Sequence, residues 1–262
     1  MKKKFSGKSA IVTGAGSGIG FDIAQQLIEQ GCNVLINDRN AELLEGAAER
    51  ISGGESLITL AGDAGDLILI QKMVDEAVEN FGRLDIVIAN AGITSYGSFL
   101  NFTPEQFSDL VDLNLRGSFF LAQRASRQMI LQGSEGRIIF MSSVTGLLAH
   151  PYLAAYGMTK AALKMLARGL VIELAPYGIT TNALAPGAVA TERTMSMTPD
   201  YDKIWGSFIP TGKVSQPSDI SRTALFLASP EAGQINGQTI TVDGGITGLC
   251  AVPDDIDKPD EE

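Results

Sequence analysis

The chain of 262 residues has few of the residue types that build metal sites, disulfide frameworks or membrane spans. Its one histidine and two cysteines, His150, Cys32 and Cys250, do not make a zinc site. The two cysteines fit free thiols in a reducing cytoplasm, although a contact between them stays open. No stretch approaches the roughly 20 apolar residues of a membrane span, and the basic start MKKKFSGKSA lacks the apolar core of a secretory signal. We therefore expect a cytoplasmic protein with no metal and no membrane partner.

Positive charge is also scarce, because 30 acidic residues face 20 basic ones and the formal net charge is -10. This balance argues against nonspecific binding of nucleic acid. Half of the net charge lies in the final segment PDDIDKPDEE, which holds six acids and one lysine. Such a run is usually solvated, so we expect a domain over residues 1–250 and an acidic tail over 251–262. A tail docked along a subunit interface is the alternative.

What the chain does contain is a regular alternation of short apolar runs and helical patterns. Seven runs are typical of strands: residues 9–12, 33–38, 56–61, 84–90, 137–142, 179–185 and 238–242. Strands that alternate with helices form a parallel sheet covered on both faces, with the ligand beyond the carboxyl ends of the strands. No linker or repeat divides the chain, so we predict one α/β domain with a seven-stranded, doubly wound parallel sheet.

A glycine-rich turn, TGAGSGIG at residues 13–20, follows the first strand. Glycine permits a tight turn and close backbone approach, and the helix that follows offers free N–H groups to a pyrophosphate. The spacing of Gly14, Gly18 and Gly20 is a variant of the dinucleotide-binding fingerprint. Ser17 is uncharged and offers no additional phosphate partner. A glycine-rich turn alone can also be no more than a tight turn.

Asp38 ends the second strand, 24 residues after Gly14. An acid at this place hydrogen-bonds the ribose hydroxyls of an adenosine and repels a 2′-phosphate, so it favours NAD over NADP. Arg39 complicates this prediction, because an arginine can hold a 2′-phosphate. A structural role for Asp38, as the N-cap of a helix beginning near Ala41, is compatible with cofactor binding.

Tyr156 and Lys160, in the run AAYGMTKAA, lie one turn apart on one face of an expected helix. A phenol with a pKa near ~10 is a poor acid or base at neutral pH, and a nearby ammonium favours its ionised form. The pair is therefore a candidate proton-transfer device. Alone it can equally be a chance pair on a solvated helix face, so its interpretation depends on the other motifs.

With these motifs in order, the chain resembles the short-chain dehydrogenase/reductase family from Lys8 to Gly245. The matching segments are TGAGSGIG, AGDAGD with Asp63, ANAG at 89–92, DLNLRG with Asn114, IIFMSSVTG with Ser143, YGMTK at 156–160, PGAVAT at 186–191 and TVDGG at 241–245. Ser143 lies 13 residues before Tyr156, which is the family interval. Two departures are mild: ANAG stands where NNAG is commoner, and Ala64 stands where valine often follows the acid.

The resemblance implies a Rossmann fold and four catalytic residues. Tyr156 would be the general acid/base, and Lys160 would hold the nicotinamide ribose and lower the pKa of Tyr156. Ser143 would hydrogen-bond the substrate oxygen, and Asn114 would anchor a water that links Lys160 to solvent. Asn114 could instead only satisfy backbone groups at a helix bend.

The resemblance also implies a cofactor site. Thr191, with the turn at Pro186 and Gly187, would orient the nicotinamide carboxamide, and Asp63 would bond the adenine amino group unless it caps a helix. The expected cofactor-binding residues are Gly14, Ser17, Gly18, Ile19, Asp38, Arg39, Asp63, Ala64, Asn90, Ala91, Gly92, Tyr156, Lys160, Pro186, Gly187, Val189 and Thr191.

The variable element of this family is a substrate lid after the sixth strand, here about residues 190–217. It mixes apolar and aromatic residues with charged ones: Met195, Met197, Tyr201, Trp205, Phe208, Glu192, Arg193 and Lys203. Such a lid can close over a ligand, or its aromatic residues can pack it onto its own body. Arg193 could grip a substrate carboxylate, or it could pair with Glu192 or with a partner subunit. His150 could face the substrate cleft or lie in a surface loop.

The expected function is hydride transfer between NAD(H) and a secondary alcohol or ketone, with a sugar, polyol or sugar acid as the leading substrate class. The segment INDRNAEL resembles gluconate 5-dehydrogenase-like members. Carrier-protein reductases of the family usually have basic residues where this chain has Ser134 and Tyr177, and an acidic chain steers an acidic carrier poorly. A 3-oxoacyl-thioester reductase is the alternative, and hydroxyacyl or steroid alcohols stay open. An alternative of another class is a noncatalytic NAD(H)-binding redox sensor.

Assembly is the last prediction. The helices expected around residues 103–132 and 155–177 carry more apolar surface than one sheet face needs. The family buries such helices in a homotetramer with two-fold axes. Residues 119–130 are the candidate dimer face.

Overall fold

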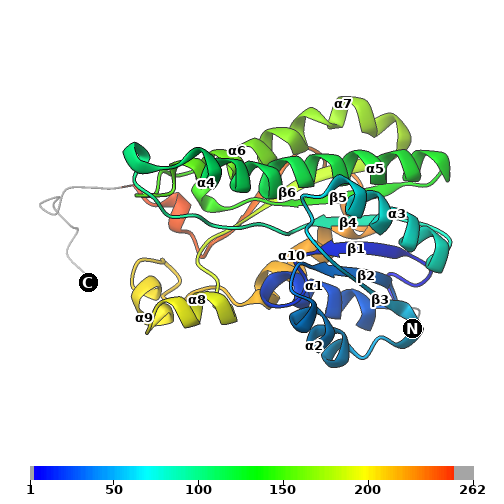
Figure 1. The fold of residues 1–262 in the computed structure, drawn as a ribbon, viewed down its shortest axis with the longest axis horizontal. Helices are drawn as coiled ribbons and strands as arrows, with labels where there is room; N and C mark the ends of the chain where they lie inside the picture. The colour runs from blue at the N-terminus through cyan, green and yellow to red at the C-terminus, as the bar shows by residue number, and fades with distance from the viewer. Residues whose placement is uncertain (1–2, 251–262) are drawn as a thin grey trace, which may run out of the picture.

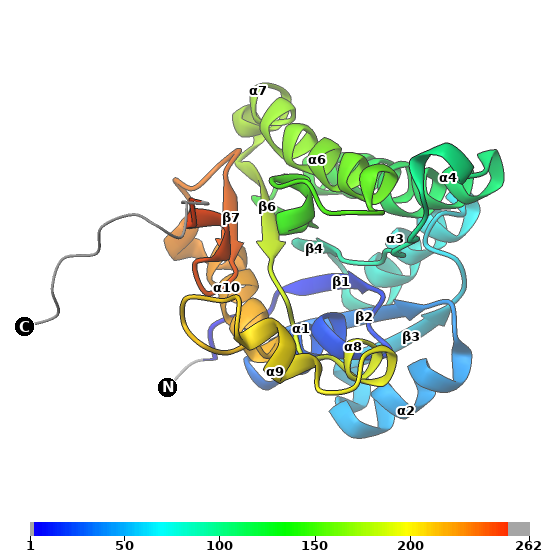
Figure 2. The ribbon, with the colours of Figure 1, turned by 90° about the vertical axis from the view of Figure 1, so that its left-hand side faces the viewer.

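The computed structural model describes residues 3–250 and is built around one parallel sheet (Figures 1 and 2). The strands are β1 (Ser9–Thr13), β2 (Asn33–Asp38), β3 (Leu57–Ala61), β4 (Ile86–Ala89), β5 (Gly136–Met141), β6 (Ile179–Pro186) and β7 (Thr239–Val242). Their order across the sheet is β3-β2-β1-β4-β5-β6-β7. The predicted seven-stranded α/β fold is confirmed, and the predicted acidic tail lies outside the described residues.

Helices cover both faces of the sheet, as a parallel sheet requires. One layer consists of α1 (Gly18–Glu29), α2 (Ala41–Ile51) and α10 (Pro217–Ala228). The opposite layer consists of α3 (Leu67–Phe81), α5 (Ser118–Leu131) and α6 (Ala154–Gly169). Figure 1 shows the first layer below the sheet and the second above it. Within residues 3–250, no helix is long and apolar enough to cross a membrane.

Each layer forms because apolar side chains recur at helical spacing and meet the apolar strands. Ile23 and Leu27 of α1 are fully buried in one core with Val12 of β1. Ile70 of α3 and Leu121 of α5 are buried in the other core with Val87 of β4. The central strands are therefore apolar on both faces, which leaves polar groups to gather at the two ends of the strands.

The strand order reverses between β1 and β4, and this point opens a crevice at the carboxyl ends of the strands. Asn90, just after β4, reaches across to the turn after β1 and donates to the carbonyls of Thr13 (2.9 Å) and Gly14 (3.0 Å). The Thr13 hydroxyl accepts from the backbone N–H of Asn90 and of Ala91. These bonds fix the two loops that form the crevice.

Two further segments border the crevice. A π-helical turn, Asp112–Gly117, joins α4 (Pro104–Val111) to α5. The expected lid follows β6 and contains α8 (Glu192–Met197) and α9 (Tyr201–Gly206), before α10 begins at Pro217. Figure 2 shows α8 and α9 in front of the first helical layer. The short helix α7 (Val171–Leu174) continues α6 away from the crevice.

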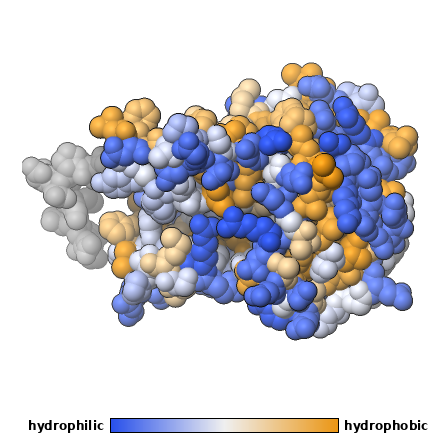
Figure 3. Space-filling model, in the orientation of Figure 1, coloured by the Kyte–Doolittle hydropathy of each residue, from blue (hydrophilic) through white to orange (hydrophobic). Residues whose placement is uncertain are grey.

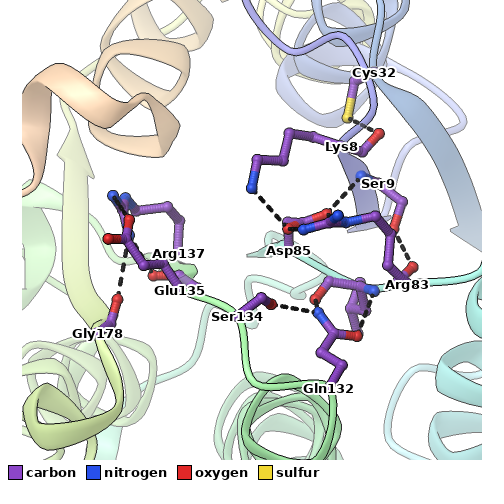
Figure 4. Close-up of polar contacts among 12 residues, drawn as sticks. Lys8, Ser9, Cys32, Arg83, Asp85, Gln132, Ser134, Glu135, Arg137 and Gly178 are labelled. Atoms are coloured by element: carbon purple, nitrogen blue, oxygen red, sulfur yellow. Dashed lines mark hydrogen bonds and ion pairs between the residues drawn. The ribbon is translucent and has the colours of Figure 1, made fainter.

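The opposite, amino-terminal ends of the strands are closed by ion pairs (Figure 4). The Asp85 side chain is 3% exposed and accepts from Lys8 Nζ (3.0 Å), Arg83 Nε (2.6 Å) and the N–H of Ser9 (3.1 Å). The buried Arg137 guanidinium donates to the carbonyl of Gly136 at 2.9 Å. Both buried charges thus have partners, as buried charges require.

Candidate active site

The turn after β1 can accept only glycine at two of its positions. A Cβ on Gly20 would lie 2.3 Å from the carbonyl oxygen of Gly14, and a Cβ on Gly14 would lie 2.9 Å from Cα of Ala91. Gly14 also has a φ of 63°, which side chains rarely adopt. The turn therefore brings its backbone close to the start of α1, as a pyrophosphate cradle needs.

The cradle holds an anion supplied by the lid. The side chain of Ser17 makes no capping bond at the start of α1. The backbone N–H of Gly18 donates instead to the carboxylate of Glu192 at 3.2 Å. A negative group therefore lies at the positive end of the α1 dipole, which is where the phosphates of a dinucleotide bind.

Asp38 lies at the far wall of the same cleft, with both carboxylate oxygens engaged. It accepts from the N–H of Gly16 (3.1 Å) and of Asn40 (3.0 Å). Asn40, not Asp38, caps α2 through a bond from the N–H of Leu43, so the N-cap interpretation of Asp38 is wrong. Two backbone bonds hold the carboxylate in one orientation beside the exposed Arg39.

Asp63 also has a fixed carboxylate, because it accepts from the N–H of Gly65 at 2.8 Å. The residue that caps α3 is Asp66, which accepts from the N–H of Ile68. The alternative that Asp63 serves as the helix cap is therefore wrong. Asp63 instead lines the cleft beside Asp38 and Ala64.

Every predicted cofactor residue lines one of two adjoining cavities, of about 330 and about 270 Å³. The first holds Gly14, Ser17, Gly18, Ile19, Asp38, Arg39, Asp63, Ala64, Asn90, Ala91, Gly92 and Thr191. The second holds Tyr156, Lys160, Pro186, Gly187 and Val189, and it shares Ile19, Asn90, Gly92 and Thr191 with the first. The residues present thus fit an extended dinucleotide, whose adenosine would lie at Asp38 and whose nicotinamide would lie at Tyr156.

Lys160 lies at the end of this cleft that also holds Tyr156. Its ammonium is buried, donates to the carbonyl of Met141 at 2.8 Å, and lies 5.6 Å from the centre of the Tyr156 ring. Burial lowers the pKa of Lys160 to about 8. An ammonium has three N–H donors, so Lys160 can also donate to hydroxyl groups of a bound ligand.

Tyr156 does not have the lowered pKa that the sequence predicted. Burial of the hydroxyl raises its pKa above the ordinary value. Hydrogen bonds with Thr94 and Ser143 and the positive charge of Arg193 act in the opposite direction, while Tyr96 adds to the rise. The prediction that Lys160 lowers the pKa of Tyr156 is therefore wrong for the protein alone, because desolvation outweighs every nearby charge.

Asn114 occupies the π-helical turn and is fully buried. Its amide oxygen accepts from the N–H of Ile93 (2.8 Å), and its amide nitrogen donates to the carbonyl of Ile93 (2.9 Å) and to Thr159 Oγ1 (3.2 Å). These bonds tie the loop after β4 to the helix that carries Tyr156 and Lys160. The alternative role, satisfying backbone groups, is thus observed, and the role as a water anchor stays a prediction.

A third cavity, of about 330 Å³, shares Ser143 and Tyr156 with the second cavity. His150 lines it from the half-exposed loop between β5 and α6, so it faces this cavity and also lies in a surface loop. Two of its residues, Thr94 and Tyr96, were not predicted from the sequence. The sequence could have predicted them, because they follow the ANAG motif closely and therefore lie near the carboxyl end of a central strand.

Comparison with known proteins agrees with this geometry. The profile of a family described as enoyl-(acyl carrier protein) reductase matches residues 14–247. A short-chain type dehydrogenase/reductase from Mycobacterium marinum has a solved structure with a TM-score of 0.88, 33% identity, and coverage of 94% of this chain and 98% of that one. The chain belongs to the short-chain dehydrogenase/reductase family.

Relatives within the short-chain dehydrogenases/reductases differ in their substrates. A 3-oxoacyl-(acyl-carrier-protein) reductase from Staphylococcus aureus is 39% identical over 241 residues, which cover 91% of this chain and 98% of that protein. An L-rhamnose 1-dehydrogenase (NAD(P)(+)) from Azotobacter vinelandii is 37% identical over 246 residues, which cover 91% and 96%. The protein is therefore an oxidoreductase of this family. The two relatives act on different substrates, so membership of the family does not identify the substrate.

Arg193 of this short-chain dehydrogenase/reductase lines both cavities of the dinucleotide cleft. Among the ion pairs of residues 3–250, none joins it to Glu192, whose carboxylate bonds Gly18 instead. The alternative that Arg193 pairs with Glu192 is therefore wrong, and its pairing with a partner subunit stays a prediction. Arg193 and Tyr156 line the same cavity, and the positive charge of Arg193 acts to lower the pKa of Tyr156.

Proposed function

We propose that the protein interconverts a secondary alcohol and a ketone with NAD(H), and that the alcohol belongs to a sugar, polyol or sugar acid. The observation that carries this proposal is the convergence of Ser143, Tyr156 and Lys160 beside a dinucleotide cleft that ends at a fixed Asp38 carboxylate. A bound nicotinamide supplies the hydride acceptor or donor. The protein supplies position, proton transfer and selection of the substrate.

In the oxidation direction, a bound nicotinamide would accept a hydride from the alcohol carbon, and the protein would have to take a proton from the alcohol oxygen. Ser143 would hold the substrate oxygen, and Tyr156 would receive the proton. Because its pKa is raised, Tyr156 first has to lose its own proton to solvent, and the positive charge of Arg193 favours that ionised form. Lys160, whose buried ammonium lies 5.6 Å from the centre of the Tyr156 ring, would hold the nicotinamide ribose. Reduction of the ketone uses the same groups in reverse.

The preference for NAD rests on Asp38. Its carboxylate is held by the N–H of Gly16 and of Asn40, so it cannot turn away from a ligand without losing two bonds. A 2′-phosphate at this wall would lie beside a fixed negative charge, whereas ribose hydroxyls can donate to it. Arg39 is exposed, so we expect it to moderate the preference and not to reverse it.

A carbohydrate substrate is supported by a relative and by the surface. One relative is named L-rhamnose 1-dehydrogenase, and this supports a sugar substrate for the present chain. The relative that reduces a carrier-bound 3-oxoacyl group keeps the thioester alternative open. Against a carrier-protein substrate, but not against a coenzyme A thioester, Ser134 and Tyr177 stand where carrier-protein reductases usually have basic residues. Ser134 bonds Gln132, and Tyr177 is 53% exposed. The net charge of -10 also opposes an acidic carrier.

We further propose a homotetramer. The residues 119–130 expected at the dimer face fall on α5, whose Phe119, Ile130 and Leu131 are exposed, and Phe107 on α4 is exposed as well. Figure 3 shows hydrophobic surface between hydrophilic residues on the side that carries these helices. Burying such groups between copies is favourable. Light scattering of the purified protein should give a tetramer, and a stable monomer would contradict the proposal.

The first test is a substrate panel followed by NADH and NADPH absorbance in both directions. The panel contains L-rhamnose and other sugars, polyols, sugar acids, acetoacetyl-CoA and bulky alcohols. We expect turnover of a sugar-type compound with NAD to exceed that with NADP by about 10-fold or more. Asp38→Asn should shrink this ratio, while Asp66→Asn, at a helix cap outside the cleft, should leave it unchanged. Thioester reduction that prefers NADPH would overturn both the cofactor and the substrate proposals.

A further inference from the structure

Four aromatic side chains line one part of the substrate cavity, and they come from two parts of the chain. Tyr96 and His150 belong to the body, and Tyr201 and Trp205 belong to α9 of the lid. The rings of His150 and Trp205 are stacked, with centroids 6.1 Å apart and planes 28° apart. Tyr96 meets His150 edge-on at 6.3 Å, and Tyr201 lies 6.1 Å from Trp205. Rings at these separations attract one another, so they form a continuous surface, which we call the aromatic wall.

The aromatic wall also carries hydrogen-bonding groups. His150 Nδ1 lies 2.7 Å from the carbonyl oxygen of Pro151, which can only accept, so Nδ1 carries the proton. Nε2 of the neutral ring is then an acceptor. Burial raises the pKa of Tyr201 to about 12, with Tyr96 adding to the rise, so its hydroxyl stays a donor at neutral pH. The wall thus combines flat apolar faces with donors and an acceptor.

We propose that the aromatic wall binds the carbon–hydrogen face of a ring-shaped, hydroxylated substrate, and that it selects the closed ring of a sugar over an open chain. This inference rests on the proposed sugar-type function and narrows it. One face of a pyranose presents contiguous C–H groups to an aromatic ring, while its hydroxyls project at the rim. An open polyol offers no comparable flat face, and an acyl thioester offers few hydroxyls. A cavity of about 330 Å³ also suits a small ring.

Both halves of the wall are needed for this selection. Trp205 and Tyr201 reach the cavity only from α9, and His150 reaches it only from the loop between β5 and α6. A ring seated beside Ser143 and Tyr156 therefore touches lid and body together. The preference for a closed ring then requires the lid to lie against the body while the substrate is bound. This preference should therefore appear in substrate affinity, independently of the groups that transfer the proton.

Trp205 is the only tryptophan of the chain, so its fluorescence reports directly on the wall. The experiment titrates Tyr156→Phe protein saturated with NAD, because this variant should hold a ligand without turning it over. The probes form matched pairs: L-rhamnose with its open-chain alditol rhamnitol, and cyclohexanol with 2-hexanol. Acetoacetyl-CoA is the extended thioester.

We expect saturable changes of Trp205 emission with the ring compounds, and a Kd for L-rhamnose about 10-fold lower than for rhamnitol, as one good aromatic contact allows. Equal affinity for ring and open chain would overturn the proposal, as would a response to acetoacetyl-CoA alone. Absence of any response to ring compounds would overturn it as well.

Variants separate the wall from general effects on the lid. His150→Gln keeps a polar side chain but removes the ring, and it should lower the preference for L-rhamnose over rhamnitol about 5-fold. Phe208→Ala is the matched control, because Phe208 is a lid aromatic that is 65% exposed and does not line the cavity. If Phe208→Ala lowers the preference as much as His150→Gln does, the wall is not the selecting element.

The two proposals fail in distinguishable ways. If the native protein turns over no sugar but cyclohexanol still binds more tightly than 2-hexanol, the sugar function fails and ring selection by the wall stands. If sugars are turned over but rhamnitol binds as tightly as L-rhamnose, the proposed function is supported and ring selection by the aromatic wall is refuted.

Discussion

The two ends of the sheet differ in how many protein partners their buried charged groups have. At the amino-terminal ends, Asp85 is enclosed by Lys8, Arg83 and the backbone of Ser9. At the carboxyl-terminal ends, the Lys160 ammonium is equally buried but has one protein carbonyl as its described hydrogen-bond partner. One end satisfies its charges internally and stabilises the fold. The other leaves hydrogen-bonding capacity for a ligand, as expected at an active site.

The largest effect is expected at the open end, from Tyr156→Phe. Removal of the hydroxyl takes away the proton acceptor, so kcat should fall by about 1,000-fold or more while NADH binding changes little. Stopped-flow turnover and NADH fluorescence titration measure the two quantities. The control is Tyr177→Phe, an exposed tyrosine far from the cavities. Unchanged turnover would contradict the mechanism, and a native protein without turnover on any substrate would favour the redox-sensor alternative.

The next effect concerns the buried charge of Lys160. Because the pKa of Lys160 is about 8 in the folded chain and 10.5 ordinarily, the unfolded chain binds more protons between these values, and stability rises with pH across that window. Below about pH 8 the buried charge costs at most roughly 3 kcal/mol. Lys160→Met should therefore raise the free energy of unfolding at pH 7, and the gain should shrink toward pH 10. Urea unfolding at several pH values measures this, and a gain that does not vary with pH would contradict it.

The third prediction breaks the closed end. Asp85→Asn leaves two cations near a buried site without their carboxylate, so the free energy of unfolding should fall by about 2 kcal/mol. Because Asp85 lies at the opposite ends of the strands from Tyr156, kcat/KM should change by less than about 2-fold. The matched control is Asp112→Asn, whose pair with Arg116 is exposed and should cost about 0.5 kcal/mol or less. A loss of activity at full stability would refute this separation of roles.

The smallest effect is expected from Glu192→Gln. The carboxylate of Glu192 occupies the start of α1, so a dinucleotide phosphate has to displace it or lie beside a like charge. A neutral amide should therefore tighten NADH binding about 2- to 5-fold. Asp202→Asn, an exposed acid on α9, should leave the affinity unchanged. Weaker NADH binding to Glu192→Gln would show that the carboxylate assists the cofactor.

The features that could be predicted from the sequence are those with local signals. Apolar runs marked all seven strands, since buried parallel strands are apolar on both faces, and the motifs placed Ser143, Tyr156 and Lys160 in one site. The predicted strand 84–90 is shorter in the structure, Ile86–Ala89, because Asp85 turns to its ion pairs. The carboxylate of Glu192 at Gly18 was not predictable, because it joins residues 174 positions apart. The raised pKa of Tyr156 was missed because spacing reveals a neighbouring charge but not desolvation.

The π-helical turn at Asp112–Gly117 has a consequence for how this chain can vary in length. A π turn takes up one residue more than an α turn, and each residue of a helix rotates the remainder of that helix by about 100°. Deleting a single residue from this segment would let it relax to α-helix and would turn Asn114 away from Ile93 and Thr159. The segment between α4 and α5 should therefore tolerate a substitution more readily than an insertion or a deletion.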